Sequence, residues 1–169
     1  MPATFEPIAS TTLSAATASV TFSSIPQTFT DLVLVIGNAL TTVNGYAYTF
    51  GVNGDTNSNY SGTILAGNGS AVASARYSNI SQTQTYFAGY YGLSTTDVAT
   101  MLVNFQNYSN TTTNKTVIAR SSAASKHAEA SVWLWRSTSA INQITIYSQS
   151  GANIASGTTL NLYGIRAGA

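Results

Sequence analysis

Apolar and polar residues alternate one for one along most of this chain, and this alternation limits its fold more than any other feature. Successive side chains of a β-strand point to opposite faces of a sheet, so the pattern indicates strands with one buried face. It is clear in "ASVTFSSI" (18–25), "GYAYTFGV" (45–52) and "EASVWLWRS" (129–137). Turn residues separate such segments at the ~8–12-residue spacing typical of sandwiches and barrels. Helical periodicity is nearly absent, with at most a turn near 94–98.

About nine or ten segments qualify as strands. Beside those above they are "DLVLVIGNAL" from Asp31, "YSGTILAG" from Tyr60, "QTYFAGYYG" (84–92), "ATMLVNFQNY" from Ala99, "KTVIARSS" from Lys115, "INQITIYSQS" from Ile141 and "TTLNLYGI" from Thr158. We therefore predict an all-β, single-domain antiparallel β-sandwich of about 8–10 strands over residues 18–169. Residues 1–17 are less patterned, and we expect an N-terminal arm there, which either docks on a neighbour or frays.

Composition excludes several classes of protein. Charged residues make up 7% of the 169 residues, against roughly 25% in ordinary soluble domains. The net charge is +1 and the basic residues are scattered, which does not fit a nucleic-acid-binding surface. No cysteine is present, so thiolate catalysis and thiolate metal sites are excluded. A surface of Ser, Thr, Asn and Tyr costs little to desolvate, which favours permanent assembly with other protein copies.

Nothing in the sequence is typical of a targeting segment. The N-terminus has no basic region, and no apolar run approaches the ~20 residues of a membrane helix. We expect the protein to be made in the cytoplasm without a signal peptide and to have no membrane partner.

The residues that catalysis would need are few. His127 is the one histidine, and on a strand it would share a face with Glu129, but no nucleophile motif accompanies the pair. The five acids are Glu6, Asp31, Asp55, Asp97 and Glu129, and none lies in the middle of a strongly apolar strand, where a raised pKa would be expected. "GNGSAV" from Gly67 lacks the lysine and helix of a phosphate loop. We therefore predict no enzyme activity and no cofactor, with His127 at a surface or interface.

The stretch "FGVNGDTNSNYSGTIL" (50–65) begins like a calcium loop, because Asp55, Asn57 and Asn59 occupy alternate positions. Tyr60 replaces the loop glycine, however, and Ala66 stands where the bidentate glutamate belongs. We interpret the stretch as a turn in which Asn53-Gly54 adopts positive φ and Asp55 and Asn57 bond to their own backbone, rather than as a metal site.

Aromatic residues are the remaining candidates for a site. In "VWLWR", Trp133 and Trp135 share one face of a strand, and Val132 and Leu134 share the other. Two assignments are open: the indoles lie in the core, or they point outward as a subunit interface or a platform for sugars. Tyr90 and Tyr91 join them as candidate interface or glycan contacts.

Three segments resemble a recurrent group of small bacteriophage virion proteins. They are "IASTTLSAATASVTFSSIPQTFTDLVLV" (8–35), "VNGDTNSNYSGTILAGNGS" (52–70) and "INQITIYSQSGANIASGTTLNLYGIR" (141–166). The resemblance implies a jelly-roll-like sandwich, commonly trimeric, without cofactor or catalytic residues. Such proteins serve as capsid decoration (cement) proteins or as the head domains of tail or head fibres.

Two functions follow from this resemblance. The first is a capsid decoration protein that binds the major capsid protein at the capsid surface and stabilises the assembled shell by mass action. The second is a receptor-binding fibre head that recognises host surface glycans through aromatic platforms. A fibre usually needs a shaft or a long anchoring segment, whereas a short arm is enough for docking on a capsid, and this favours decoration.

Overall fold

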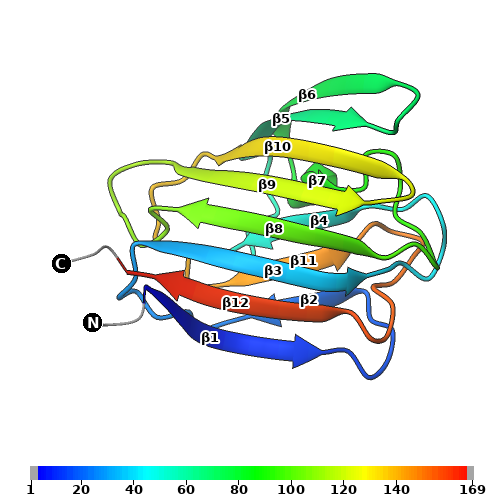
Figure 1. Ribbon diagram of the computed structural model, residues 1–169. Helices are drawn as coiled ribbons and strands as arrows, with labels where there is room; N and C mark the ends of the chain where they lie inside the picture. Colours follow the sequence, from blue (N-terminus) through cyan, green and yellow to red (C-terminus); the bar gives the residue numbers. More distant parts are fainter. Residues whose placement is uncertain (1–3, 167–169) are drawn as a thin grey trace.

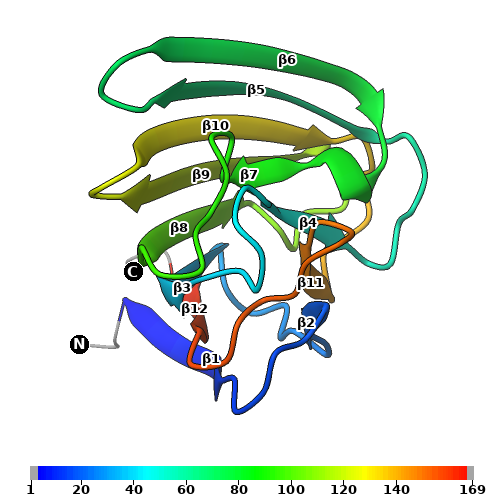
Figure 2. The ribbon, with the colours of Figure 1, turned by 90° about the vertical axis from the view of Figure 1, so that its right-hand side faces the viewer.

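Twelve strands in two antiparallel sheets make up the computed structural model, which describes residues 4–166 (Figure 1). The sheets pack face to face, as the view in Figure 2 shows, and this confirms the predicted antiparallel β-sandwich. The larger sheet has eight strands in the order β1-β12-β3-β8-β9-β10-β5-β6, and the smaller has four in the order β2-β11-β4-β7. A 3-10 turn, η1 (Gln82–Gln84), is the single helical element in the described residues.

The strands span the following residues: β1 Phe5–Thr12, β2 Ser19–Phe22, β3 Asp31–Ala39, β4 Tyr48–Val52, β5 Tyr60–Gly67, β6 Val72–Ile80, β7 Tyr86–Ala88, β8 Ala99–Gln106, β9 Lys115–Ala123, β10 His127–Trp135, β11 Ile144–Ser148 and β12 Thr159–Ile165. Each of the ten predicted strand segments overlaps one of these strands. The other two, β1 and β6, were not predicted.

Eight of the strands have the connectivity of a jelly roll, which consists of two Greek keys spread over two sheets. The first strand pairs with the last (β1 with β12), the second with the second-last (β2 with β11), and the third with the third-last of the eight (β3 with β8). The innermost pair, β4 and β7, closes the smaller sheet. The described residues therefore fit the jelly-roll topology.

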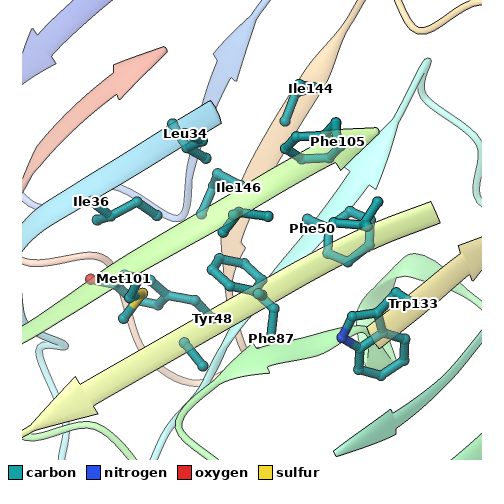
Figure 3. Close-up of a cluster of buried hydrophobic side chains, with 14 of the residues drawn as sticks. Leu34, Ile36, Tyr48, Phe50, Phe87, Met101, Phe105, Trp133, Ile144 and Ile146 are labelled. Atoms are coloured by element: carbon teal, nitrogen blue, oxygen red, sulfur yellow. The ribbon is translucent and has the colours of Figure 1, made fainter. Parts of the chain in front are cut away.

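Two hairpins enlarge one of the two sheets. β5–β6 is inserted between β4 and β7, and β9–β10 between β8 and β11. Both hairpins join the larger sheet beyond β8, so this sheet has twice as many strands as its partner (Figure 1). The core lies between the sheets, and aromatic rings fill its centre. Phe50 makes edge-to-face contacts with Phe87, Phe105 and Trp133 (Figure 3), and also with Tyr60.

The N-terminal arm predicted at residues 1–17 is wrong for the part that the structure describes. β1 is the edge strand of the larger sheet and pairs with β12 from Phe5–Ile165 to Thr12–Thr159. Leu13 and Thr17 continue the attachment through backbone hydrogen bonds to Thr158 and Ile154. Pro7 interrupts the alternating pattern by which strands were predicted. A proline has no N–H to donate to a neighbouring strand, so it is tolerated only at the edge of a sheet or at a bulge. The register does shift between Pro7 and Ala9.

Two glycines in the larger sheet lie beneath aromatic rings. Gly62 on β5 is the cross-strand neighbour of Trp133, and a Cβ at position 62 would lie 2.2 Å from Cε3 of that indole. The indole extends over Gly62 and stacks on Tyr77 of β6, with ring centroids 5.8 Å apart. Phe29 covers Gly164 of β12 in the same way. An aromatic ring that covers a glycine of a sheet is a known means of fixing strand register.

We expect Gly62→Ala to lower the free energy of unfolding by about 1–3 kcal/mol, since the new methyl group displaces Trp133 in a well-packed core. Urea denaturation followed by tryptophan fluorescence measures the change. Gly67→Ala on the same strand is the control: its Cβ would meet its nearest neighbour at 3.8 Å, so it should change stability by less than about 0.5 kcal/mol. Equal effects at the two positions would contradict this account.

Candidate interaction surface

The side of the larger sheet that faces away from the core carries exposed apolar side chains on four neighbouring strands, β9, β10, β5 and β6, and the half-buried Leu102 on the adjoining β8. We call the outward side chains of β8, β9, β10, β5 and β6 the broad face (front in Figure 1). The strand register arranges them in rows. One row reads Leu102, Arg120, Ala130, Leu65, Ser74, and a second reads Asn104, Ile118, Val132, Thr63, Arg76.

Large apolar groups on the broad face are open to water. Val72 is 78% exposed, Leu65 56% and Val132 46%. Between them stand small residues, among which Ala128 and Ala130 leave a hollow of about 630 Å³. A second hollow of about 350 Å³ lies further along the same strands, beside Val132 and Leu134. Exposed apolar surface of this kind is a feature of surfaces that bind other molecules, proteins among them.

The broad face carries almost no charge. Its outward residues include two charged side chains, Arg76 and Arg120, and both are basic. A partner that matches this face has an apolar surface with carboxylates placed opposite the two guanidinium groups.

Trp133 and Trp135 lie in the core, 1% and 3% exposed, so the prediction of an interface or glycan contact at these residues is wrong. Of the two assignments left open by the sequence, the one with buried indoles holds, and Val132 and Leu134 point outward. The physical reason is that other parts of the chain cover the inner face of β10: Phe50 and Tyr77 both contact the indole of Trp133. Trp135 satisfies its N–H by donating to Asp55 Oδ2 at 2.7 Å.

Tyr90 and Tyr91 lie in the turn 89–92, where Tyr90 is exposed and Tyr91 is half-buried against the core. Gly92 N donates to Gly89 O at 2.7 Å to close this turn, and both glycines have positive φ. The two tyrosine rings meet edge to face with centroids 5.4 Å apart. The structure brings these two predicted residues together, but it buries both indoles, so the four do not form one exposed site.

Glu129 holds this turn from the inner face of β10. Its carboxylate accepts hydrogen bonds from Gly89 N at 2.6 Å and Tyr90 N at 2.8 Å. Burial raises the pKa of Glu129, although the two backbone donors oppose the shift. The predicted sharing of a face by His127 and Glu129 is confirmed, but the face is the buried one.

His127 is a buried residue, which corrects the predicted surface position. Neither imidazole nitrogen has a hydrogen-bond partner among the described residues. Burial, with a contribution from Lys126, lowers its pKa. No serine hydroxyl bonds to it within the described chain, so the geometry does not assemble a base and nucleophile.

Asp55 is the centre of the hydrogen bonds in the loop that begins, in sequence, like a calcium-binding loop. Its Oδ1 accepts hydrogen bonds from the backbone and side-chain N–H groups of Asn57, and Oδ2 accepts from Asn59 Nδ2 and Trp135 Nε1, all at 2.7–2.9 Å. Burial acts to raise the pKa of Asp55, but these hydrogen bonds together lower it. Asn57 and Asn59 thus present N–H groups, not oxygens, to the carboxylate.

The turn before Asp55 forms as predicted. Asn53 and Gly54 both have positive φ, and Asp55 N donates to Val52 O at 2.9 Å. Asn53 also joins this turn to the segment before β11, because its Oδ1 accepts from Asn142 N and its Nδ2 donates to Ala140 O. Within residues 4–166 no three His, Cys, Asp or Glu residues gather as metal ligands would, and no helix is long and apolar enough to cross a membrane.

Comparison with protein-family models, with curated proteins and with solved structures finds no match to this chain. The broad face was not predicted from the sequence. The sequence did contain an indication of it. In an alternating strand the residues of the outward face should be polar, but Leu65, Ile118 and Val132 occupy such positions and are apolar.

We expect the melting temperature to be the same in Ca²⁺ and in a chelator, because the Asp55 carboxylate is already bonded to four donors. Asp55→Ala should lower the free energy of unfolding by about 2–3 kcal/mol, since Trp135 Nε1 loses its acceptor. Differential scanning calorimetry measures both effects. Asp97→Ala, which removes the acceptor of a hydrogen bond from Ser94, is the control, and it should lower the free energy of unfolding by less than Asp55→Ala does. A rise in melting temperature on addition of Ca²⁺ would contradict the interpretation of this loop as a turn without a metal site.

Glu129 should give stability a measurable pH dependence. Its pKa in the folded chain is above the ordinary value of 4.5, so the folded state binds the proton more tightly than the unfolded state. The resulting stabilisation is complete below pH 4.5 and is lost as pH rises through the raised pKa. As pH falls from 7 to 4.5, the wild-type chain should therefore gain stability relative to Glu129→Gln in urea denaturation.

Glu6→Gln is the matched control for this measurement. The exposed Glu6 pairs with Arg166, whose hydrogen bond lowers the pKa of the carboxyl. Its contribution to stability is therefore lost as pH falls, which is the opposite direction. A difference between wild type and Glu129→Gln that does not change with pH would contradict the assignment of a raised pKa.

Proposed function

We propose that this chain is a structural protein of a bacteriophage virion, a decoration protein that binds the assembled capsid and acts without catalysis. The broad face is the surface that docks on the major capsid protein. The single observation that carries this assignment is the exposed apolar surface across β9, β10, β5 and β6, with Arg76 and Arg120 as its charged residues. The resemblance of residues 8–35, 52–70 and 141–166 to small phage virion proteins supports it.

The two inserted hairpins also support docking through this face. A jelly roll needs the eight paired strands alone, and β5–β6 and β9–β10 add four strands to one sheet. Four of the five strands of the broad face come from these hairpins. The enlargement creates a wide, nearly uncharged surface, which a neighbouring protein covers at a low cost in desolvation.

Decoration is favoured over a glycan-binding fibre head built on exposed tryptophans, because both indoles are buried. The protein is further proposed to be a homotrimer, which the phage resemblance implies. The aromatic residues do not support this, since the rings expected at a subunit interface fill the core instead.

Binding to purified empty capsids of the encoding phage tests the proposal. We expect saturable binding of the wild-type chain, and density at symmetry-related positions of the shell by cryo-electron microscopy. Ala130→Glu should weaken binding at least roughly tenfold, because it places a carboxylate in the hollow beside Leu65 and next to Arg120, where the partner would have to bury it.

Thr111→Glu is the control, since Thr111 is an exposed residue of the loop between β8 and β9 and lies outside the broad face. It should bind capsids like the wild type. Multi-angle light scattering of the free protein measures whether its mass is that of a trimer. Binding confined to the tail vertex, or to host cells and not to capsids, would overturn the decoration function; an equal loss of capsid binding in both variants would overturn the choice of face.

A further inference from the structure

The smaller sheet carries a hollow on its side away from the core, opposite the broad face. Its volume is about 650 Å³, within the range of ~300–1000 Å³ typical of sites for small organic ligands. It is more enclosed than either hollow of the broad face. The side chains around it are also of a different kind: tyrosine, glutamine, serine and threonine predominate, and none is charged.

One cross-strand row makes the floor of this hollow. Ser19 of β2 pairs with Tyr147 of β11, Tyr147 pairs with Thr49 of β4, and Thr49 pairs with Tyr86 of β7. The row therefore crosses all four strands of the sheet, with tyrosines at two of its positions. Both tyrosines are half-buried, so part of each side chain is held by the protein and part remains accessible.

The turn η1 forms a wall, and buried contacts hold it in place. Thr85, which is fully buried, donates its hydroxyl proton towards Phe50 O and Gln82 O, and its Oγ1 accepts from Phe50 N at 3.0 Å. Gln82 then packs on Gly51 of β4: a Cβ on Gly51 would lie 3.1 Å from Gln82 Cβ and Cγ and 3.3 Å from the ring of Tyr147. The missing side chain at position 51 thus brings Gln82 against Tyr147.

Two polar atoms of residues that line the hollow have no hydrogen-bond partner among the described residues. They are Gln82 Oε1 and Ser148 Oγ. Ser148 is 9% exposed, so its hydroxyl is withheld from bulk water as well. Both atoms are closed to water, so a ligand in the hollow does not reach them; Ser148 pairs with the core residue Tyr48 and lies on the inner side of the sheet. The polar groups that the hollow does offer to a ligand belong to accessible residues, among them Tyr147, Thr83 and Gln84.

We propose that this hollow, defined by Tyr86, Tyr147, Thr49, Gln82 and Gln84, binds a neutral saccharide. Carboxamides and hydroxyls donate and accept hydrogen bonds without charge, which matches the hydroxyls of a sugar ring. Tyrosine rings offer an apolar face with a polar tip, which matches the C–H groups of the same ring. The absence of any lysine, arginine or histidine around the hollow disfavours phosphate, nucleotide or carboxylate ligands.

This site does not depend on capsid docking. It lies on the opposite side of the sandwich from the broad face, so a chain docked through the broad face leaves the hollow open. The two functions are therefore tested separately, and a variant of one site should leave the other unchanged.

A microarray of neutral and acidic glycans, probed with the labelled full-length chain, tests the proposal, followed by calorimetric titration with the strongest neutral ligand. We expect saturable binding to neutral glycans. Gln82→Ala should weaken it at least roughly tenfold by removing a carboxamide. Thr83→Trp, a change at an exposed residue beside the hollow, should abolish binding by filling the space without altering the core. Gln106→Ala, the same kind of change on the broad face, should bind like the wild type.

Three results would overturn the saccharide site. The first is the absence of neutral glycan binding by the wild-type chain, and the second is equal or stronger binding of acidic glycans. The third is binding that survives both Gln82→Ala and Thr83→Trp in chains whose melting temperature shows them to be folded. Capsid binding by Gln82→Ala, measured in parallel, should equal that of the wild type whichever result is obtained.

Discussion

The larger sheet has four strands more than the sheet against which it packs, and the inner face of these surplus strands must be shielded from water by other parts of the chain. The interior of the molecule is arranged around this requirement. Trp133 lies over Gly62 and stacks on Tyr77, so that the indole covers the backbone of β5. The turn 89–92 lies beneath β10 and is fastened there by the carboxylate of Glu129. The cost of burying this carboxylate is offset by two backbone N–H donors that would otherwise lack partners.

The same requirement explains why the broad face differs from the opposite side of the molecule. The surplus strands need apolar side chains inward to join the core, and they also carry Leu65, Ile118 and Val132 outward. Strands with apolar residues on both faces are typical of sheets covered on both sides. Within the described chain one side is covered and the other is not, so the broad face has the composition of a surface that a second protein completes. The four-stranded sheet instead has a polar row beneath η1, which suits a small hydroxylated ligand better than a protein partner.

Individual elements show which parts of the fold can be predicted from the local sequence and which cannot. The Asn53-Gly54 turn was predicted because two adjacent residues that tolerate positive φ favour one hairpin geometry, and no distant contact is needed to specify it. β6 was missed because small residues dominate its alternation and its inward side chains are only half-buried. β1 was missed because Pro7 interrupts its pattern, and the bulge that accommodates Pro7 depends on pairing with β12, over 150 residues away. The jelly-roll connectivity was implied by resemblance to phage proteins, since period-two patterning identifies strands but not their neighbours.

The sequence by itself determined the all-β class, ten of the strands, the Asn53-Gly54 turn and the sharing of one face by Trp133 with Trp135 and by His127 with Glu129. These are consequences of backbone geometry within a few residues, where alternation and turn chemistry act directly. Only the tertiary structure decided which of the two faces is buried. A period of two divides a strand into two sets of side chains but does not say which set is buried. On β10 the outward set is entirely apolar, whereas the buried set combines His127, Glu129 and Ser131 with the two indoles. The buried face of β10 is the one covered by β7, the turn 89–92 and Tyr77, because these distant segments exclude water from that side of the sheet alone.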